Sequence, residues 1–159
     1  MSDSVETKIR EALLYRLGQI TVANGYENDI GDVFDDFPDD TGDIDDFPAV
    51  VALTGFDSRT NLDNEMLYVT ARATLLAFVD PSGPVVEDTE TIKQDVQRML
   101  GLNPALPGSG SAPTCELAVY AGAEPFGRVL DMPQAPNLRG TRITVEIRYQ
   151  QELADPTVS

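Results

Sequence analysis

The stretch EMLYVTARATLLAFV, residues 65–79, decides the fold because its side chains alternate in character. Every second position from Leu67 to Val79 is aliphatic, whereas the positions between them include Tyr68, Thr70 and Arg72. Successive side chains of a strand point to opposite faces of the sheet. The stretch therefore predicts a long strand with one face against a core and one amphipathic face.

Other periodic stretches supply the partners of this strand. Apolar residues at three- and four-residue spacing predict helices over 4–23 and from Asp88 or Thr89 to Leu100. Alternating or short apolar runs predict strands over 49–54, 114–121 and 137–151, with a further short strand around 32–34. Residues 57–64 have the composition of a polar turn. The order α-β-β-α-β-β predicts an α+β fold, a mainly antiparallel sheet of about four strands packed against two helices.

The chain length suits one domain. A chain of 159 residues can bury a single sizeable core. We expect one domain over residues 1–151 and a C-terminal tail over 152–159. Inside this domain, residues 27–46 have the composition of an acidic irregular arm, and the residues of 103–113, rich in proline, glycine and serine, that of a flexible linker.

Negative charge is the strongest compositional signal. The chain holds 27 acidic and 11 basic residues, a net charge of −16, and ten of the acidic residues lie between Glu27 and Asp46. Such a surface repels the nucleic-acid backbone and anionic membranes, so we expect neither as a binding partner. No apolar run approaches the roughly 20 residues of a membrane span, and the N-terminal residues lack the regions of a signal peptide.

The residue types of common catalytic and metal sites are scarce. The chain has no histidine, and Cys115, the single cysteine, lies in an apolar alternation typical of a core. The acidic segment does not fit the spacing of an EF-hand loop, because neither Gly31 nor Gly42 has an aspartate at the first ligand position. We expect no catalytic residue, no cofactor and no dedicated metal site, although weak divalent binding by the aspartates stays open.

Seven charged residues are candidates for a subunit or partner interface. Arg72 and Arg148 lie in the middle of predicted strands, on the faces opposite the aliphatic stripes. They are either ordinary solvated side chains or residues that pair with carboxylates of another subunit. The candidate carboxylates belong to the acidic segment: Asp35, Asp36, Asp39, Asp40 and Asp43.

The first 31 residues resemble the opening of the tail terminator, or tail completion, proteins of long-tailed bacteriophages. The resemblance is carried by IREALLYRL at 9–17, ITVANGY at 20–26 and DIG at 29–31. The later elements follow the family's order, with FPAVV at 47–51, the long strand, a helix over 88–100 and the final strand RITVEIRYQ at 142–150. The acidic segment and the 103–113 linker are longer than the family's pattern.

The resemblance implies a structural virion protein and no enzyme. Such a protein is made in the host cytoplasm and forms a ring, usually a hexamer, at the head-proximal end of the tail tube. Its partners are further copies of itself, the tail tube protein, a head–tail connector or stopper and, in contractile tails, the sheath; DNA passes through the lumen as cargo. The alternatives are another neck protein, such as a stopper or collar, or a small hydrolase or Ca²⁺-binding module that uses the aspartates.

Overall fold

A computed structural model describes residues 4–35, 46–53, 59–63, 66–109, 112–126 and 139–152. Two α-helices and six strands occur in these ranges, together with one short 3₁₀ turn, Val22–Asn24. The helices are α1 (Val5–Gly18) and α2 (Val85–Leu102). The strands are β1 (Asp32–Phe34), β2 (Ala49–Leu53), β3 (Arg59–Asp63), β4 (Met66–Val79), β5 (Leu117–Phe126) and β6 (Arg139–Glu152).

The strands form one mixed sheet in the order β1-β2-β4-β6-β5, and β3 pairs with the first part of β4. β1 and β2 run parallel, and all other neighbours run antiparallel. The α+β class is therefore confirmed. The short strand expected around 32–34 joins the sheet as β1, and the expected number of about four strands is too low because part of the segment read as a polar turn also forms a strand, β3.

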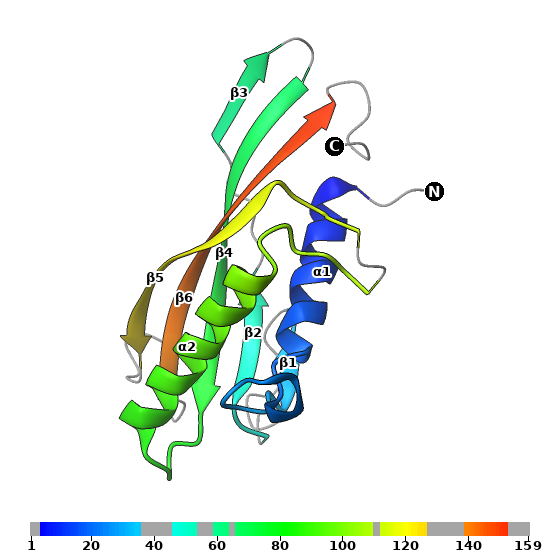
Figure 1. Ribbon diagram of the computed structural model, residues 1–159. Coiled ribbons are helices and arrows are strands. Elements are labelled where there is room, and N and C mark those ends of the chain that lie inside the picture. Colours follow the sequence, from blue (N-terminus) through cyan, green and yellow to red (C-terminus); the bar gives the residue numbers. More distant parts are fainter. Residues whose placement is uncertain are drawn as a thin grey trace.

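Both helices pack on the same face of the sheet, and their apolar stripes form the main core (Figure 1). The α1 residues Ile9, Leu13 and Leu17 and the α2 residues Ile92 and Val96 are fully buried. They meet the aliphatic stripe that the alternation of β4 predicted: Val69, Ala71, Ala73, Leu75, Ala77 and Val79. The upper part of the sheet, with β3 and the adjoining ends of β4 and β6, projects beyond the helices (Figure 1).

The helix boundaries differ from those expected. Helix α1 ends at Gly18, five residues before the predicted end, and the chain then passes through the 3₁₀ turn to Gly25. Gly25 has φ 93°, a conformation that favours glycine. Helix α2 begins earlier than expected, after Pro84, and continues beyond the expected end at Leu100 to Leu102.

The described part of the expected 103–113 linker is docked on the domain. Leu106 is fully buried in the main core. Arg16 Nε of α1 donates to the Pro107 carbonyl oxygen at 2.6 Å, and the Thr114 hydroxyl donates to the Leu106 carbonyl oxygen at 2.7 Å. The expectation of a flexible linker is thus corrected for this part, because the composition did not reveal that Leu106 anchors it.

A second apolar cluster lies on the opposite face of the sheet. It consists of Ala49 and Val51 of β2 with Leu76 and Phe78 of β4, all buried. The end of β4 is therefore buried on both faces, and the expected amphipathic face is limited to the first part of the strand.

Candidate functional site

The candidate site is the face of the sheet turned away from α1 and α2, which we call the outer face. Cross-strand partners share a face of a sheet. Arg72 of β4 pairs with Glu146 of β6, which in turn pairs with Val119 of β5. Arg148 lies two residues further along β6 and therefore shares this face. The structure thus brings Arg72 and Arg148 to one surface, on neighbouring strands.

A single carboxylate, that of Glu146, neighbours both arginines. Arg148 donates from Nη2 and Nε to Glu146 Oε1 at 3.1 and 3.3 Å, and its side chain is 57% exposed. Arg72 lies opposite Glu146 in the ladder and is exposed, as is Tyr68 on the same strand. An exposed ion pair contributes about 0–1 kcal/mol. The outer face therefore carries a local excess of positive charge around Arg72 and Arg148, and the exposed ion pair of Arg148 with Glu146 adds little to stability.

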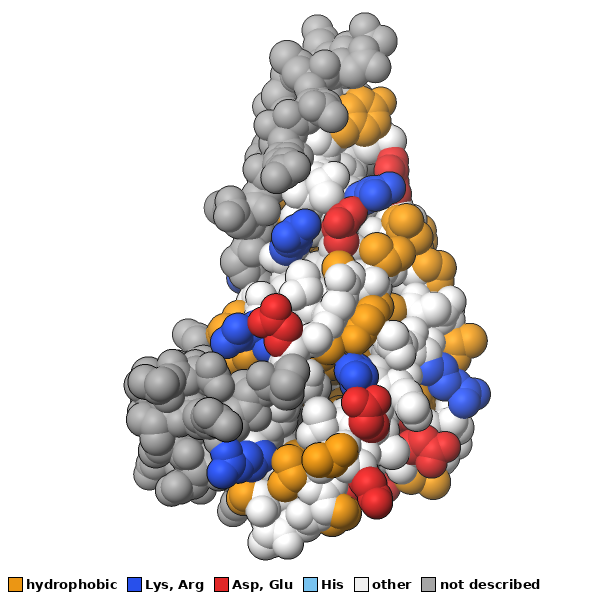
Figure 2. Space-filling view, turned by 90° about the vertical axis from the view of Figure 1, so that its left-hand side faces the viewer, with side chains coloured by type: hydrophobic (Ala, Val, Ile, Leu, Met, Phe, Trp, Pro, Cys, Tyr) orange, Lys and Arg blue, Asp and Glu red, His pale blue; other side chains and the backbone are white. Residues whose placement is uncertain are grey.

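The surface outside the group of Arg72, Glu146 and Arg148 is more mixed in charge than this group. Figure 2 views the side of the molecule that carries β5 and α2, and there basic and acidic side chains lie close to one another with hydrophobic side chains between them. Arg142 lies six residues before Arg148 on β6 and therefore also on the outer face, 3.9 Å from Glu124 of β5. Lys93 of α2 pairs with Glu90 at 2.9 Å, and this hydrogen bond raises the pKa of the lysine.

The described part of the acidic segment does not form an arm. Residues 27–35 belong to the fold, since Ile30 packs against the main core and β1 pairs with β2. Asp35 directly follows β1 and is exposed. The other candidate carboxylates, Asp36, Asp39, Asp40 and Asp43, lie outside the described residues.

The second part of the segment that carries the family resemblance, residues 20–30, folds into a compact turn after α1. The Ile30 amide donates to the Ile20 carbonyl oxygen at 3.0 Å and so closes the turn at its base. Inside it, the Asp29 carboxylate accepts from the Val22 amide at 2.8 Å, and the Thr21 hydroxyl accepts from the Asn24 amide at 3.2 Å. Asp29 and Thr21 thus stabilise the turn by accepting hydrogen bonds from its backbone.

Asp95 fixes this turn to α2, and the sequence analysis did not identify it. Its carboxylate is 2% exposed and accepts from the backbone amides of Glu27 and Asn28, each at 2.9 Å, and from the Asn28 side chain at 2.8 Å. The sequence feature that could have identified Asp95 is its position three residues after Ile92, which places a carboxylate on the apolar stripe of the helix. A carboxylate on such a stripe needs hydrogen-bond donors from elsewhere in the fold.

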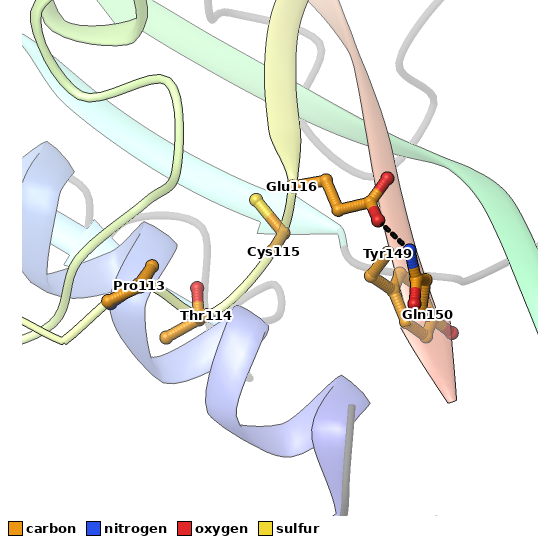
Figure 3. A pocket seen from close by; sticks show the side chains of 6 residues that line it. All are labelled: Pro113, Thr114, Cys115, Glu116, Tyr149 and Gln150. Carbon is orange, nitrogen blue, oxygen red and sulfur yellow. Dashed lines mark hydrogen bonds between the residues drawn. The ribbon is translucent and has the colours of Figure 1, made fainter. Parts of the chain in front are cut away.

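Cys115 and Tyr149 line a cavity of about 240 Å³ beside α1 (Figure 3). Burial raises the pKa of the Cys115 thiol to about 12, and a protonated thiol is a poor nucleophile. Burial also raises the pKa of Tyr149, whose hydroxyl donates to Glu6 Oε1 at 3.1 Å. Gln150, the neighbour of Tyr149 on β6, donates to Glu116. The contacts of this cavity tie α1 and β5 to β6.

Neither a metal cluster nor a membrane-spanning helix is found in the described part of the chain. Within these residues no three His, Cys, Asp or Glu side chains gather closely enough to hold a metal ion. Neither described helix is long and apolar enough to cross a membrane. In comparisons with known proteins, no family matches the chain and no curated protein matches it.

Proposed function

We propose that the chain is a structural virion protein that forms a ring at the head-proximal end of a phage tail tube, where it stops tube polymerisation and joins the tail to the head connector. The proposal rests on the resemblance of residues 9–31 to the tail terminator family. Its support in the fold is that these residues form α1 and one closed turn, held to α2 by the buried Asp95.

The outer face supports a role in assembly. A subunit of a ring needs two different surfaces that fit each other. The outer face offers Arg72 and Arg148 among threonine and aliphatic side chains, and arginine is enriched in protein interfaces. The strongly acidic chain suits a conduit for DNA, because an acidic lumen does not retain a polyanion.

The direct test is the length of tails made without this protein. Phage lysates produced without the chain would be compared by electron microscopy with lysates complemented by the wild-type gene. We expect overlong tails that carry no heads, because nothing stops the tube. Normal-length tails that fail to join heads would instead identify a stopper or connector, and normal phage particles would refute a role in the neck.

The acidic segment can be tested by substitution but not by deletion. Because β1 and β2 are parallel, the chain must return from the end of β1 to the start of β2, and such a crossover needs a dozen or more residues. We therefore propose replacing Asp36, Asp39, Asp40 and Asp43 together by asparagine.

This variant should keep the fold and lose assembly. Removing four like charges that lie close in sequence lowers electrostatic repulsion, so we expect the thermal midpoint of the monomer not to fall. We expect a lower yield of tailed particles in a complementation assay. A normal particle yield would exclude these aspartates from the interface, and a lost cooperative transition would show that they belong to the folded domain.

A further inference from the structure

The described residues contain an acidic surface complementary to the outer face. Glu27, Asp35 and Asp46 are exposed, and Asp29 is also exposed although it accepts one hydrogen bond from the turn. Glu27 and Asp29 precede β1 and Asp46 precedes the parallel strand β2, whereas Asp35 follows β1, so these residues flank the two ends of the β1 edge of the sheet. We call Glu27, Asp29, Asp35 and Asp46 the acidic edge.

The acidic edge and the arginines lie at different parts of the same sheet. β1 is the last strand on one side, whereas Arg72 and Arg148 lie on β4 and β6, with β2 between β4 and β1. The acidic edge has no ion pair with lysine or arginine among the described residues. Among the described residues, one carboxylate, that of Glu146, is placed beside Arg72 and Arg148 by the ladder and by an ion pair, and the two guanidinium groups together offer more donors than this carboxylate accepts. Arginine presents five N–H donors and can bind carboxylates in pairs.

We infer that a second copy of this chain docks its acidic edge on the outer face, so that Arg72 and Arg148 of one copy bind carboxylates of the next. This inference rests on the proposed ring and names the surfaces that build it. A contact between two different surfaces is heterologous, and such contacts close into a ring when the rotation between neighbours permits. Charge complementarity selects a second copy as the occupant, since the chain carries a net charge of −16 and presents exposed acids at this edge.

Charge reversal of each surface tests the inference on the purified full-length chain. Arg148→Glu changes the outer face, and Asp35→Lys changes the acidic edge. We expect each variant alone to associate at least about tenfold more weakly than the wild type in sedimentation velocity, because like charges then meet at every contact. Glu11→Lys, at an exposed position of α1, makes the same charge change as Asp35→Lys elsewhere and should associate like the wild type.

An equal mixture of the two reversed variants gives the decisive result. In an alternating assembly, the glutamate introduced at position 148 meets only the lysine introduced at position 35, and the native Arg148 meets only the native Asp35. We therefore expect the mixture to recover the association of the wild type, and expect added salt to weaken both. A mixture that stays dissociated, single variants that associate normally, or a wild-type chain that remains monomeric at its highest soluble concentration would each overturn the inference.

The same variants separate this inference from the proposed function. If the mixture restores association but tails made without the protein have normal length, the docked surfaces stand and the role at the tail end is wrong. If tails are overlong without the protein but Arg148→Glu still associates and complements normally, the role stands and the docked surfaces are wrong.

Discussion

Replacing Gly140 by alanine should damage the pairing of β4 and β6 near one end of their ladder. Gly140 of β6 lies opposite Phe78 of β4, where the two longest strands pair. A Cβ atom at this position would overlap the Ala77 carbonyl oxygen and lie 2.9 Å from the Ala77 carbonyl carbon and 3.1 Å from the Phe78 Cα. All three are backbone atoms, so no side-chain rotation relieves the overlap, and the strands must move apart.

The size of the effect follows from two contributions, the overpacking at the added methyl group and the weakening of ladder hydrogen bonds between β4 and β6. Overpacking costs about 1–3 kcal/mol, and each weakened ladder hydrogen bond costs about 1 kcal/mol more. We expect Gly140→Ala to lower the free energy of unfolding by about 3 kcal/mol. For a chain of this size this corresponds to a fall in thermal midpoint of about 6–12 °C.

Thermal unfolding followed by circular dichroism measures this shift, with Gly101→Ala as the matched control. Gly101 is exposed inside α2, and a Cβ atom there would have no neighbour within 4 Å. Alanine is favoured over glycine in a helix by about 0.5–1 kcal/mol, so the control should melt slightly higher than the wild type. A Gly140→Ala midpoint within about 2 °C of the wild type would refute the close approach of β4 and β6.

Three further substitutions test other parts of the structure. Asp95→Ala should lower the free energy of unfolding by about 3 kcal/mol in urea titrations, because it leaves the backbone amides of Glu27 and Asn28 without their charged acceptor. Gln94→Ala, at the exposed neighbouring position, should change the free energy of unfolding by less than about 0.5 kcal/mol. Burial raises the pKa of Cys115 from 9.0 to about 12 in the folded state. The contribution of the protonated thiol to stability is therefore complete below pH 9 and is lost as the pH rises towards 12. Cys115→Ala should flatten this part of the stability–pH curve, and an unchanged slope would contradict the burial of the thiol. Arg72→Glu should change the thermal stability of the monomer by no more than about 1 kcal/mol, as for a solvated surface site, and a larger loss in calorimetry would place this arginine in the fold rather than at an interface.

The sequence revealed those elements whose hydrophobic pattern is strong. β4 and β6 alternate over most of their length, and α1 and α2 carry regular stripes, so the α+β class followed from local pattern alone. β3 was missed because Arg59–Asp63 is polar and is a strand only through its pairing with β4. Leu106 was missed for a related reason: its burial depends on packing in the main core with α1, far away in the sequence.

The candidate site was predictable only in part. The positions of Arg72 and Arg148 opposite the aliphatic stripes placed them on one side of their strands. Their relation to Glu146 depends on the register between β4 and β6, which periodicity does not specify. Asp95 shows the same limit, because its partners lie 67 and 68 positions away in the sequence.

The length of the β4–β6 ladder has a mechanical consequence for the projecting part of the sheet. The two strands are paired at every position from Met66 with Glu152 to Val79 with Arg139, and at about 3.3 Å per residue this ladder is roughly 45 Å long. Ladder hydrogen bonds lie across the strands. A force that pulls β4 and β6 in opposite directions along the strands therefore loads all of these bonds together in shear, whereas a force that peels β3 sideways breaks its few pairs one after another. The sheet is thus stiff along its length and yields first at its tip.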